Sequence, residues 1–173
     1  MKVLLHICCA VCASFSIEKL RQEGCDLSGY FYNPNIQPEQ EYLKRLKETE
    51  KLAKRQKLPL IIGDYEIDKW RLRIKGLEEE PEGGRRCRRC FALRLEEAAK
   101  KVKEKAFDVF TTTLTISPHK NSQVINEIGQ KAGGDLFLAR DFKKQDGFKR
   151  TQELAQEHNI YRQHYCGCIY SLR

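Results

Sequence analysis

The chain opens with Met1-Lys-Val-Leu-Leu-His-Ile-Cys-Cys-Ala-Val-Cys12, and this stretch decides the fold. Residues 3–7 form a mainly apolar run of strand length, which ends at three cysteines, Cys8, Cys9 and Cys12. A short apolar run that gives way to helical periodicity is typical of a buried parallel strand entering a helix. Ligands bind at the carboxyl ends of such strands. A phosphate-binding protein has glycines at this point, whereas this chain has thiols, so the sequence predicts a metal site.

Strand-like and helix-like segments alternate along the rest of the chain. We predict further strands over 27–32, 60–62, 107–112 and 136–138. We predict helices from a cap at Ser14 or Ser16 to residue 22, and over 39–57, 67–74, 87–105, 121–132 and 150–158. This alternation indicates an α/β fold, a doubly wound parallel sheet with helices on both faces. We expect one domain over 1–173, with a helical insertion over 63–105 that carries Cys87 and Cys90 and a C-terminal tail over 159–173.

The composition is that of an ordinary globular protein. The 173 residues suffice for one domain with a core, and no apolar run approaches the ~18–20 residues of a membrane span. The apolar run at the N-terminus is too short for a signal peptide, and charged residues soon follow it. We therefore expect a cytoplasmic protein with no membrane partner. The net charge of +8 favours a polyanionic partner such as nucleic acid.

Seven of the eight cysteines are clustered, which metal binding or thiol redox chemistry requires. In a reducing compartment a disulfide scaffold is disfavoured. A zinc site or a four-iron cluster takes four thiolates, so seven thiols indicate one closed site and a second, open site or a redox pair. The pair Cys166-Gly-Cys168 is either a strained, redox-active disulfide or two ligands of a second metal, and both alternatives stay open. The eighth, Cys25, is expected to be a small buried hydrophobe.

Arginines surround the second cysteine pair, at Arg85, Arg86, Arg88 and Arg89. They are either a solvated surface or a group that offsets the charge of thiolates and contacts phosphates. We favour phosphate contact.

Other polar residues follow the predicted strands. The loop that contains Thr113, Thr115, Ser117 and Lys120 should face the same crevice as Cys8. The stretch Tyr32-Asn33-Pro34-Asn35 either binds a nucleobase or forms a plain turn. Asp64 and Asp141 are either turn formers or site carboxylates. His6, inside a strand, is expected to be a core histidine with satisfied hydrogen bonds.

Five ordered motifs carry a family resemblance. The stretches HICCAVC at 6–12, YFYNPNI at 30–36, RRCRRCFALRL at 85–95, TTTLTISPHK at 111–120 and YRQHYCGCIYS at 161–171 resemble the cobalamin-independent epoxyqueuosine reductases. The resemblance implies the nucleotide-hydrolase (HUP) type of doubly wound fold, with PP-loop ATPases as distant kin. This chain lacks the Ser-Gly-Gly phosphate loop that ATP use would need.

The resemblance also implies an activity, the last step of queuosine synthesis in transfer RNA (tRNA). The epoxide of the modified base is deoxygenated to a cyclopentene by two electrons from an external donor, with release of water. By motif, a 4Fe-4S cluster would be held by Cys8, Cys9, Cys87 and Cys90. The remaining matched thiols would form a catalytic second iron site or a redox disulfide at Cys12, Cys166 and Cys168.

The tRNA anticodon arm is the expected partner. The expected substrate contacts are Tyr32, Asn33, Asn35, Arg88, Arg89, Thr113, Ser117 and Lys120. One rival interpretation is a zinc-stabilised tRNA-binding module without catalysis, which leaves three thiols unused. Another is a thiol oxidoreductase that uses the C-terminal pair alone, which leaves the arginines unexplained.

Overall fold

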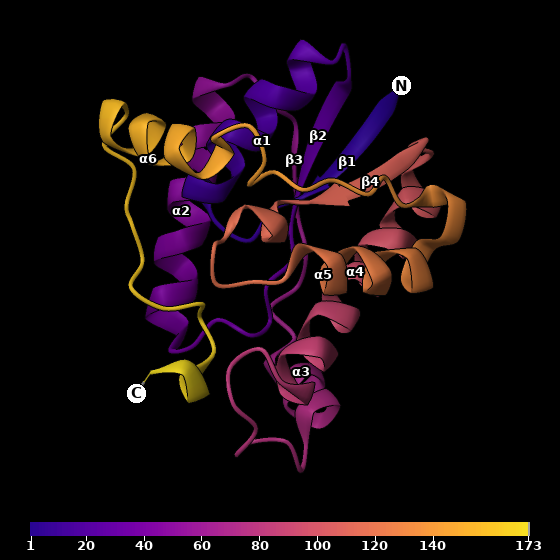
Figure 1. Cartoon of the computed structure of the whole chain (residues 1–173), viewed down its shortest axis with the longest axis vertical. Helices are drawn as coiled ribbons and strands as arrows, with labels where there is room; N and C mark the ends of the chain where they lie inside the picture. The colour runs from indigo at the N-terminus through magenta and orange to yellow at the C-terminus, as the bar shows by residue number, and fades with distance from the viewer. Residues whose placement is uncertain (173) are drawn as a thin grey trace.

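A four-stranded parallel sheet forms the centre of the computed structural model, which describes residues 1–172. The strands are β1 (Lys2–His6), β2 (Asp26–Phe31), β3 (Leu60–Ile62) and β4 (Val109–Thr112), in the order β3-β2-β1-β4. Strand β1 is central, and its register pairs Leu4 with Ser28 on one side and with Phe110 on the other. The predicted doubly wound parallel α/β fold is confirmed (Figure 1).

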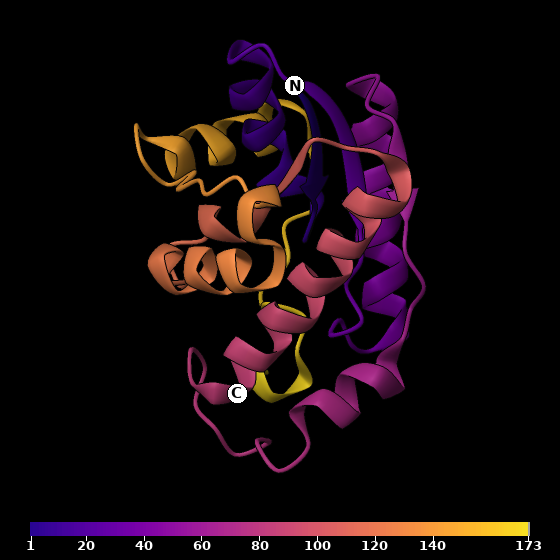
Figure 2. The ribbon, with the colours of Figure 1, turned by 90° about the vertical axis from the view of Figure 1, so that its right-hand side faces the viewer.

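Helices cover both faces of the sheet. They are α1 (Ala10–Gln22), α2 (Glu39–Arg55), α3 (Ile67–Ile74), α4 (Arg85–Lys105), α5 (Ser122–Gly133) and α6 (Gly147–Glu157). Helices α1, α2 and α6 lie on one face, and α3, α4 and α5 lie on the other (Figures 1 and 2). None of these helices has the length and apolar character that crossing a membrane requires.

The alternation of side chains along β1 divides the core in two. Val3, Leu5 and Ile7 pack into the cluster under α1, α2 and α6, whereas Leu4 packs into the cluster under α3, α4 and α5. All four side chains are fully buried. Successive residues of a strand point to opposite faces of a sheet, so one apolar run supplies both halves of the core.

Two predicted elements are wrong. The first helix begins at Ala10 with Cys9 as its N-cap, not at Ser14 or Ser16. The hydroxyls of those two serines donate to carbonyl oxygens within the helix, at 2.7 and 3.0 Å, which is how serine is accommodated inside a helix.

The predicted strand over 136–138 is also wrong. Only Phe137 forms a bridge to β4, opposite Phe110, and Gly134–Leu136 forms a 3₁₀ turn. The segment is apolar because Phe137 is buried, with its ring centroid 5.2 Å from that of Phe110. A run of three apolar residues serves a buried turn as well as a strand.

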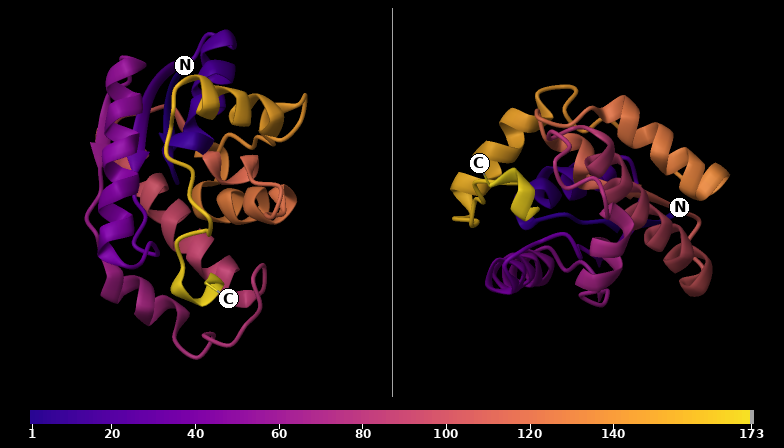
Figure 3. Two further views of the ribbon diagram at one scale, coloured as in Figure 1. Left: turned by 90° about the vertical axis from the view of Figure 1, so that its left-hand side faces the viewer. Right: turned by 90° about the horizontal axis from the view of Figure 1, so that it is seen from below.

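The last residues of the chain return to the site. The segment that follows α6 runs along the outside of the molecule and ends in a 3₁₀ turn, Ile169–Ser171, close to the beginning of α4 (Figures 2 and 3). Cys168 is buried within the same cluster as Cys90 of α4. Two segments that are far apart in the sequence therefore bring their cysteines together.

Candidate metal centre

A cavity of about 550 Å³ lies beyond the carboxyl ends of the strands. Its walls include residues that follow β1, β2 and β4, at Cys8, Asn35 and Ser117. Six cysteines line it, namely Cys8, Cys12, Cys87, Cys90, Cys166 and Cys168. The cavity is therefore where the sequence predicted a ligand site, and it is rich in thiols.

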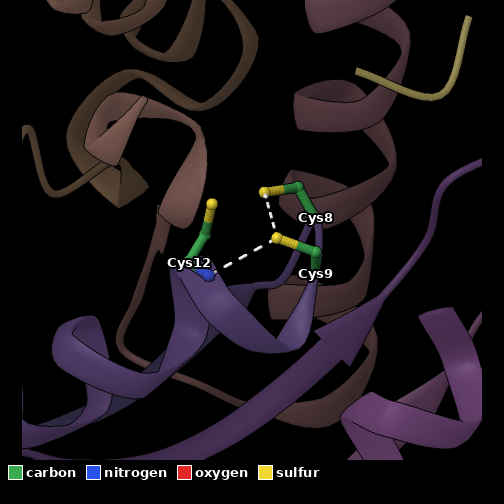
Figure 4. Close-up of side chains that lie close together, drawn as sticks. All are labelled: Cys8, Cys9 and Cys12. Carbon is green, nitrogen blue, oxygen red and sulfur yellow. Dashed lines mark hydrogen bonds between the residues drawn. The ribbon is translucent and has the colours of Figure 1, made fainter. Parts of the chain in front are cut away.

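The first three cysteines come together because α1 begins between them. Cys9 caps the helix, since its Sγ accepts the backbone N–H of Cys12 at 3.4 Å. The sulfur of Cys8 lies 3.9 Å from that of Cys9, and the three sulfurs lie within 4.8 Å of one another (Figure 4). Within residues 1–172 no other group of three or more His, Cys, Asp or Glu side chains converges this closely.

Hydrogen bonds among these three thiols shift their pKa values in opposite directions. Hydrogen bonds from Cys12 and Cys9 hold the pKa of Cys8 well below the ordinary value of a thiol, although burial opposes the shift. The pKa of Cys12 is raised because its thiol donates hydrogen bonds to the sulfurs of Cys8 and Cys9, of which the bond to Cys8 has the larger effect. A hydrogen bond from Cys12 lowers the pKa of Cys9, but its bond to Cys8 and its burial outweigh this and raise the pKa to about 12. The hydroxyl of Thr113 also donates to the Cys8 sulfur, at 3.2 Å.

Helix α4 contributes the second pair. Cys87 and Cys90 are one turn apart and line the cavity, whereas Arg88 and Arg89 between them are exposed and do not line it. Burial raises the pKa of both thiols. At Cys90 the charge of Arg94 and the nearby indole N–H of Trp70 oppose that rise. Residues three apart share a helix face, so both thiols lie on the side of α4 that lines the cavity.

The third pair is held by contacts between the tail and the rest of the fold. Arg45 of α2 is buried and donates to the carbonyl oxygens of Cys166 and Tyr165 at 3.1 and 3.0 Å. The N–H of Gln37 donates to the carbonyl oxygen of Gly167 at 2.8 Å. Gly167 has a φ of +111°, and an added Cβ would lie 2.8 Å from Ile36. Glycine is required here both by the backbone angle and by the close approach.

The C-terminal pair consists of free thiols, as do all eight cysteines. A hydrogen bond from Cys168 lowers the pKa of Cys166 to about 5. The charge of Cys166 in turn raises the pKa of both Cys87 and Cys90. The tail pair is therefore next to the pair on α4, while Cys12 lies against Cys8 and Cys9.

The predicted substrate contacts divide into two sets. Asn35, Ser117 and Lys120 line the cavity, whereas the other five do not. Asn33 is buried, where it donates to the carbonyl of Ile7 at 2.9 Å and accepts from Arg94 at 2.7 Å.

The remaining predicted contacts lie behind or outside the cavity wall. The Tyr32 hydroxyl donates to Glu66 at 2.7 Å, and Thr113 contacts the cavity through Cys8. Cys25 is only partly buried and packs near the opposite end of the sheet. Asp64 and Asp141 do not line the cavity either.

His6 is a core histidine with both ring nitrogens hydrogen-bonded, as predicted. Nε2 lies 3.1 Å from the carbonyl oxygen of Tyr32, so it carries the proton, and Nδ1 accepts from the Thr112 hydroxyl at 2.9 Å. Burial, with the nearby charge of Arg94, lowers its pKa to about 3. The ring is therefore neutral at physiological pH.

Three buried cations line the cavity, Arg45, Arg86 and Arg94, with exposed fractions of 2%, 1% and 3%. Sequence reasoning singled out Arg86 and missed the other two. Arg94 is four residues from Cys90, and this helical spacing was the one signal that pointed to it. Arg45 gave no signal, because its helix carries charged residues on most of its surface.

The donor set fits a thiophilic metal centre. Several thiols and no histidine or carboxylate converge closely at the start of α1, and thiolates are the ligands of zinc and of iron-sulfur clusters. The buried cations nearby would offset the negative charge that such a centre carries.

Comparison with known proteins gives concordant matches. Residues 3–173 match the family described as epoxyqueuosine reductase QueH. The epoxyqueuosine reductase QueH of Streptococcus pyogenes serotype M1 is 43% identical over 180 residues, which cover 99% of this chain and 70% of the relative. That of Acinetobacter baylyi is 43% identical over 176 residues, with 99% and 81% covered. That of Thermotoga maritima is 38% identical over 176 residues, with 98% and 90% covered.

Proposed function

The chain belongs to the epoxyqueuosine reductase QueH family, and we propose that it removes the epoxide oxygen of epoxyqueuosine in tRNA. The observation that carries this proposal is the convergence of cysteines from three separate segments on one cavity. In the reaction both C–O bonds of the epoxide break and a carbon–carbon double bond forms. Two electrons from an external donor and two protons are taken up, and the oxygen leaves as water.

We assign the thiols to two centres. The ligands assigned to a 4Fe-4S cluster are Cys8, Cys9, Cys87 and Cys90. The thiols assigned to a second iron or a redox-active pair are Cys12, Cys166 and Cys168. When bound, the cluster supplies single electrons at low potential. Cys9 is the one assigned ligand that does not line the cavity, so its replacement is the sharpest test of the assignment.

The chain itself supplies positive charge where the oxygen departs. Lys120 lines the cavity and its charge lowers the pKa of both Cys8 and Cys166. A cation fixed at this point would stabilise the negative charge that develops on the epoxide oxygen, as preorganised charges do in other active sites. We assign Lys120 this role.

The RNA strand would approach the side of the cavity that carries Lys120, Phe148 and Arg162. All three line the cavity, and Phe148 is exposed by 39%, which is unusual for a phenylalanine. Aromatic rings stack on unpaired bases and cations contact phosphates. The exposed Arg88 and Arg89 would hold phosphates farther from the modified base.

Anaerobic reconstitution with iron and sulfide, followed by turnover of epoxide-bearing tRNA, tests the activity. We expect brown protein with acid-labile sulfide and formation of queuosine. Cys90→Ser should lose both the colour and the activity, whereas Cys25→Ser, which alters a cysteine outside the cavity, should lose neither. Protein that loads iron but leaves the epoxide intact would contradict the proposed reaction.

The competing function is a zinc-stabilised tRNA-binding module. It predicts colourless protein with tightly bound zinc and full affinity for tRNA, but no turnover. Metal analysis of the purified protein separates the two functions.

The salt dependence of tRNA affinity tests the approach of the RNA. Lys120→Gln combined with Arg162→Gln should weaken binding and flatten its dependence on salt, because the variant removes two positive charges from the side of the cavity that would face the RNA. Arg88→Gln combined with Arg89→Gln should do the same. Lys51→Gln, on the outer surface of α2, serves as the control. Binding that is unchanged in both double variants would reject the assigned surface.

A further inference from the structure

Three buried N–H groups in the wall of the cavity have no hydrogen-bond acceptor. They are Nε1 of Trp70, Nε of Arg86 and Nε of Arg94. A buried donor without a partner costs about 1–3 kcal/mol, so such groups are rare unless something else satisfies them. Their shared position indicates that an acceptor belongs in the cavity.

Of the three residues, Arg94 has the greatest need of a negatively charged partner. Its side chain is 3% exposed, and its hydrogen bond is to the neutral amide of Asn33, at 2.7 Å. Within residues 1–172 it forms no ion pair with a carboxylate. An isolated buried charge is strongly unfavourable unless an opposite charge compensates it. Cys90 precedes Arg94 by four residues on α4, and both line the cavity, so a negative charge on the Cys90 sulfur would lie next to the guanidinium.

Trp70 belongs to the same buried cluster as Cys90, and both line the cavity. It is 1% exposed, and its ring is stacked on Tyr170 with centroids 6.4 Å apart and planes at 24°. This stacking fixes the indole from one side and leaves its N–H in the cavity wall without an acceptor. Trp70 lies on α3 and Arg94 on α4, so two helices bring unpartnered donors to the part of the cavity that holds Cys90.

Arg86 differs from the other two. Its Nη1 donates to the carbonyl oxygens of Glu78, at 2.8 Å, and of Glu80, and its guanidinium lies 5.3 Å from the centre of the Tyr170 ring. These contacts hold the loop before α4 in place. The fold therefore explains why Arg86 is buried although its Nε has no acceptor, and the two donors whose burial these contacts do not explain are those of Trp70 and Arg94.

We propose that Trp70 and Arg94 are positioning residues that donate N–H···S hydrogen bonds to Cys90 when its sulfur binds the metal centre, and that they raise the reduction potential of that centre. The proposal rests on the proposed function, because it needs a redox-active centre at Cys90. Hydrogen bonds to a ligand sulfur withdraw negative charge and stabilise the more negative, reduced state. The centre would then accept electrons from a weaker donor.

The chain contains one tryptophan, which allows an isosteric test. Replacing tryptophan by benzothienylalanine throughout the chain alters only Trp70 and removes its N–H while keeping the shape of the ring. Arg94→Lys keeps the charge but loses the planar fork of donors. Arg88→Met, on the exposed side of the same helix, removes a charge without removing a donor to Cys90.

The readout is the fraction of reduced centre at a fixed potential, followed by visible absorption in anaerobically loaded protein. We expect the ratio of reduced to oxidised centre to fall about tenfold for the tryptophan analogue, as loss of a hydrogen bond to a charged group implies. Arg94→Lys should lower the ratio as well, and Arg88→Met should leave it nearly unchanged. Iron content should be the same in all variants.

An unchanged ratio in the tryptophan analogue, at full iron content, would overturn the proposal. That result would leave the proposed function intact. Wild-type protein that binds no iron would instead overturn the metal assignment and this inference together. If Arg94→Lys fails to fold, the tryptophan analogue still tests the proposal, because benzothienylalanine has nearly the volume of tryptophan.

Discussion

Replacing Gly167 with alanine should detach the C-terminal tail and carry Cys166 and Cys168 away from the cavity. The φ of +111° at this position strains any residue with a Cβ, at about 1–3 kcal/mol. The new Cβ would also lie 2.8 Å from Ile36 Cγ1 and 3.2 Å from Arg45 Nη1. Overpacking of this kind costs about another 1–3 kcal/mol, so the total penalty is about 2–6 kcal/mol.

This penalty is as large as the contribution of the polar contacts that dock this part of the tail. Four hydrogen bonds hold it, two from Arg45, one from the N–H of Gln37 and one from the Tyr165 hydroxyl to the carbonyl oxygen of Gln37. At about 0.5–1.5 kcal/mol each, they contribute about 2–6 kcal/mol. The docked and detached forms should therefore become comparable in population, while the sheet and its helices stay folded.

Alkylation of the metal-free, reduced protein measures the detachment cysteine by cysteine, with mass spectrometry to assign the rates. We expect faster modification of Cys166 and Cys168 and an unchanged rate at Cys25. Gly76→Ala is the matched control, because Gly76 has a φ of +79° but no atom within 4 Å of the added Cβ. Equal rates at the tail cysteines in Gly167→Ala and wild type would refute the reasoning.

Three further outcomes concern the stability of the metal-free protein, measured by urea unfolding. The pKa of His6 is lowered to about 3 in the folded state, so below pH ~6.5 only the unfolded chain takes up a proton at this histidine. His6 should therefore lower the free energy of unfolding by about 2 kcal/mol from pH 7 to pH 5. A flat profile would contradict this. Asn121→Ala removes the cap of α5, which accepts the N–H of Val124, and should cost about 1 kcal/mol; Ser122→Ala, next to the cap, is the comparison. Gly147→Ala would place a Cβ against the carbonyl oxygen of Phe142 and should cost about 3 kcal/mol or more, so a wild-type urea midpoint would show that the turn before α6 can rearrange.

The sequence predicted the structure correctly where a local pattern is compatible with only one type of secondary structure. The apolar run of β1 and the alternation of segments predicted the sheet, and the cysteine that follows β1 predicted the edge where the cavity lies. The beginning of α1 was missed because Cys9 is an unusual N-cap and two serines follow it, and serine is a preferred capping residue. The strand over 136–138 was wrong because burial of Phe137 depends on its packing against Phe110, which no local pattern reveals.

The candidate site depends more on long-range contacts. Arg88 and Arg94 belong to one basic helix, and the sequence did not show that one is exposed and the other buried. The docking of the tail by Arg45 joins residues more than a hundred positions apart. Such contacts are decided by how the helices pack on the sheet, so residue type and spacing predicted a ligand site at the end of β1 but not which other side chains surround it.

The cysteine segments lie far apart in the sequence, and this separation affects the stability of the folded chain once a metal is bound. A cluster bound by the thiols at the start of α1 and by those of α4 would act as a cross-link that closes a loop of roughly 75 residues. By the chain-entropy relation for disulfides, a loop of that length contributes about 4 kcal/mol to stability. Loading of the cluster would therefore restrict the unfolded chain as a covalent cross-link does. Removal of the metal by a chelator should lower the free energy of unfolding of the whole domain as well as empty the cavity.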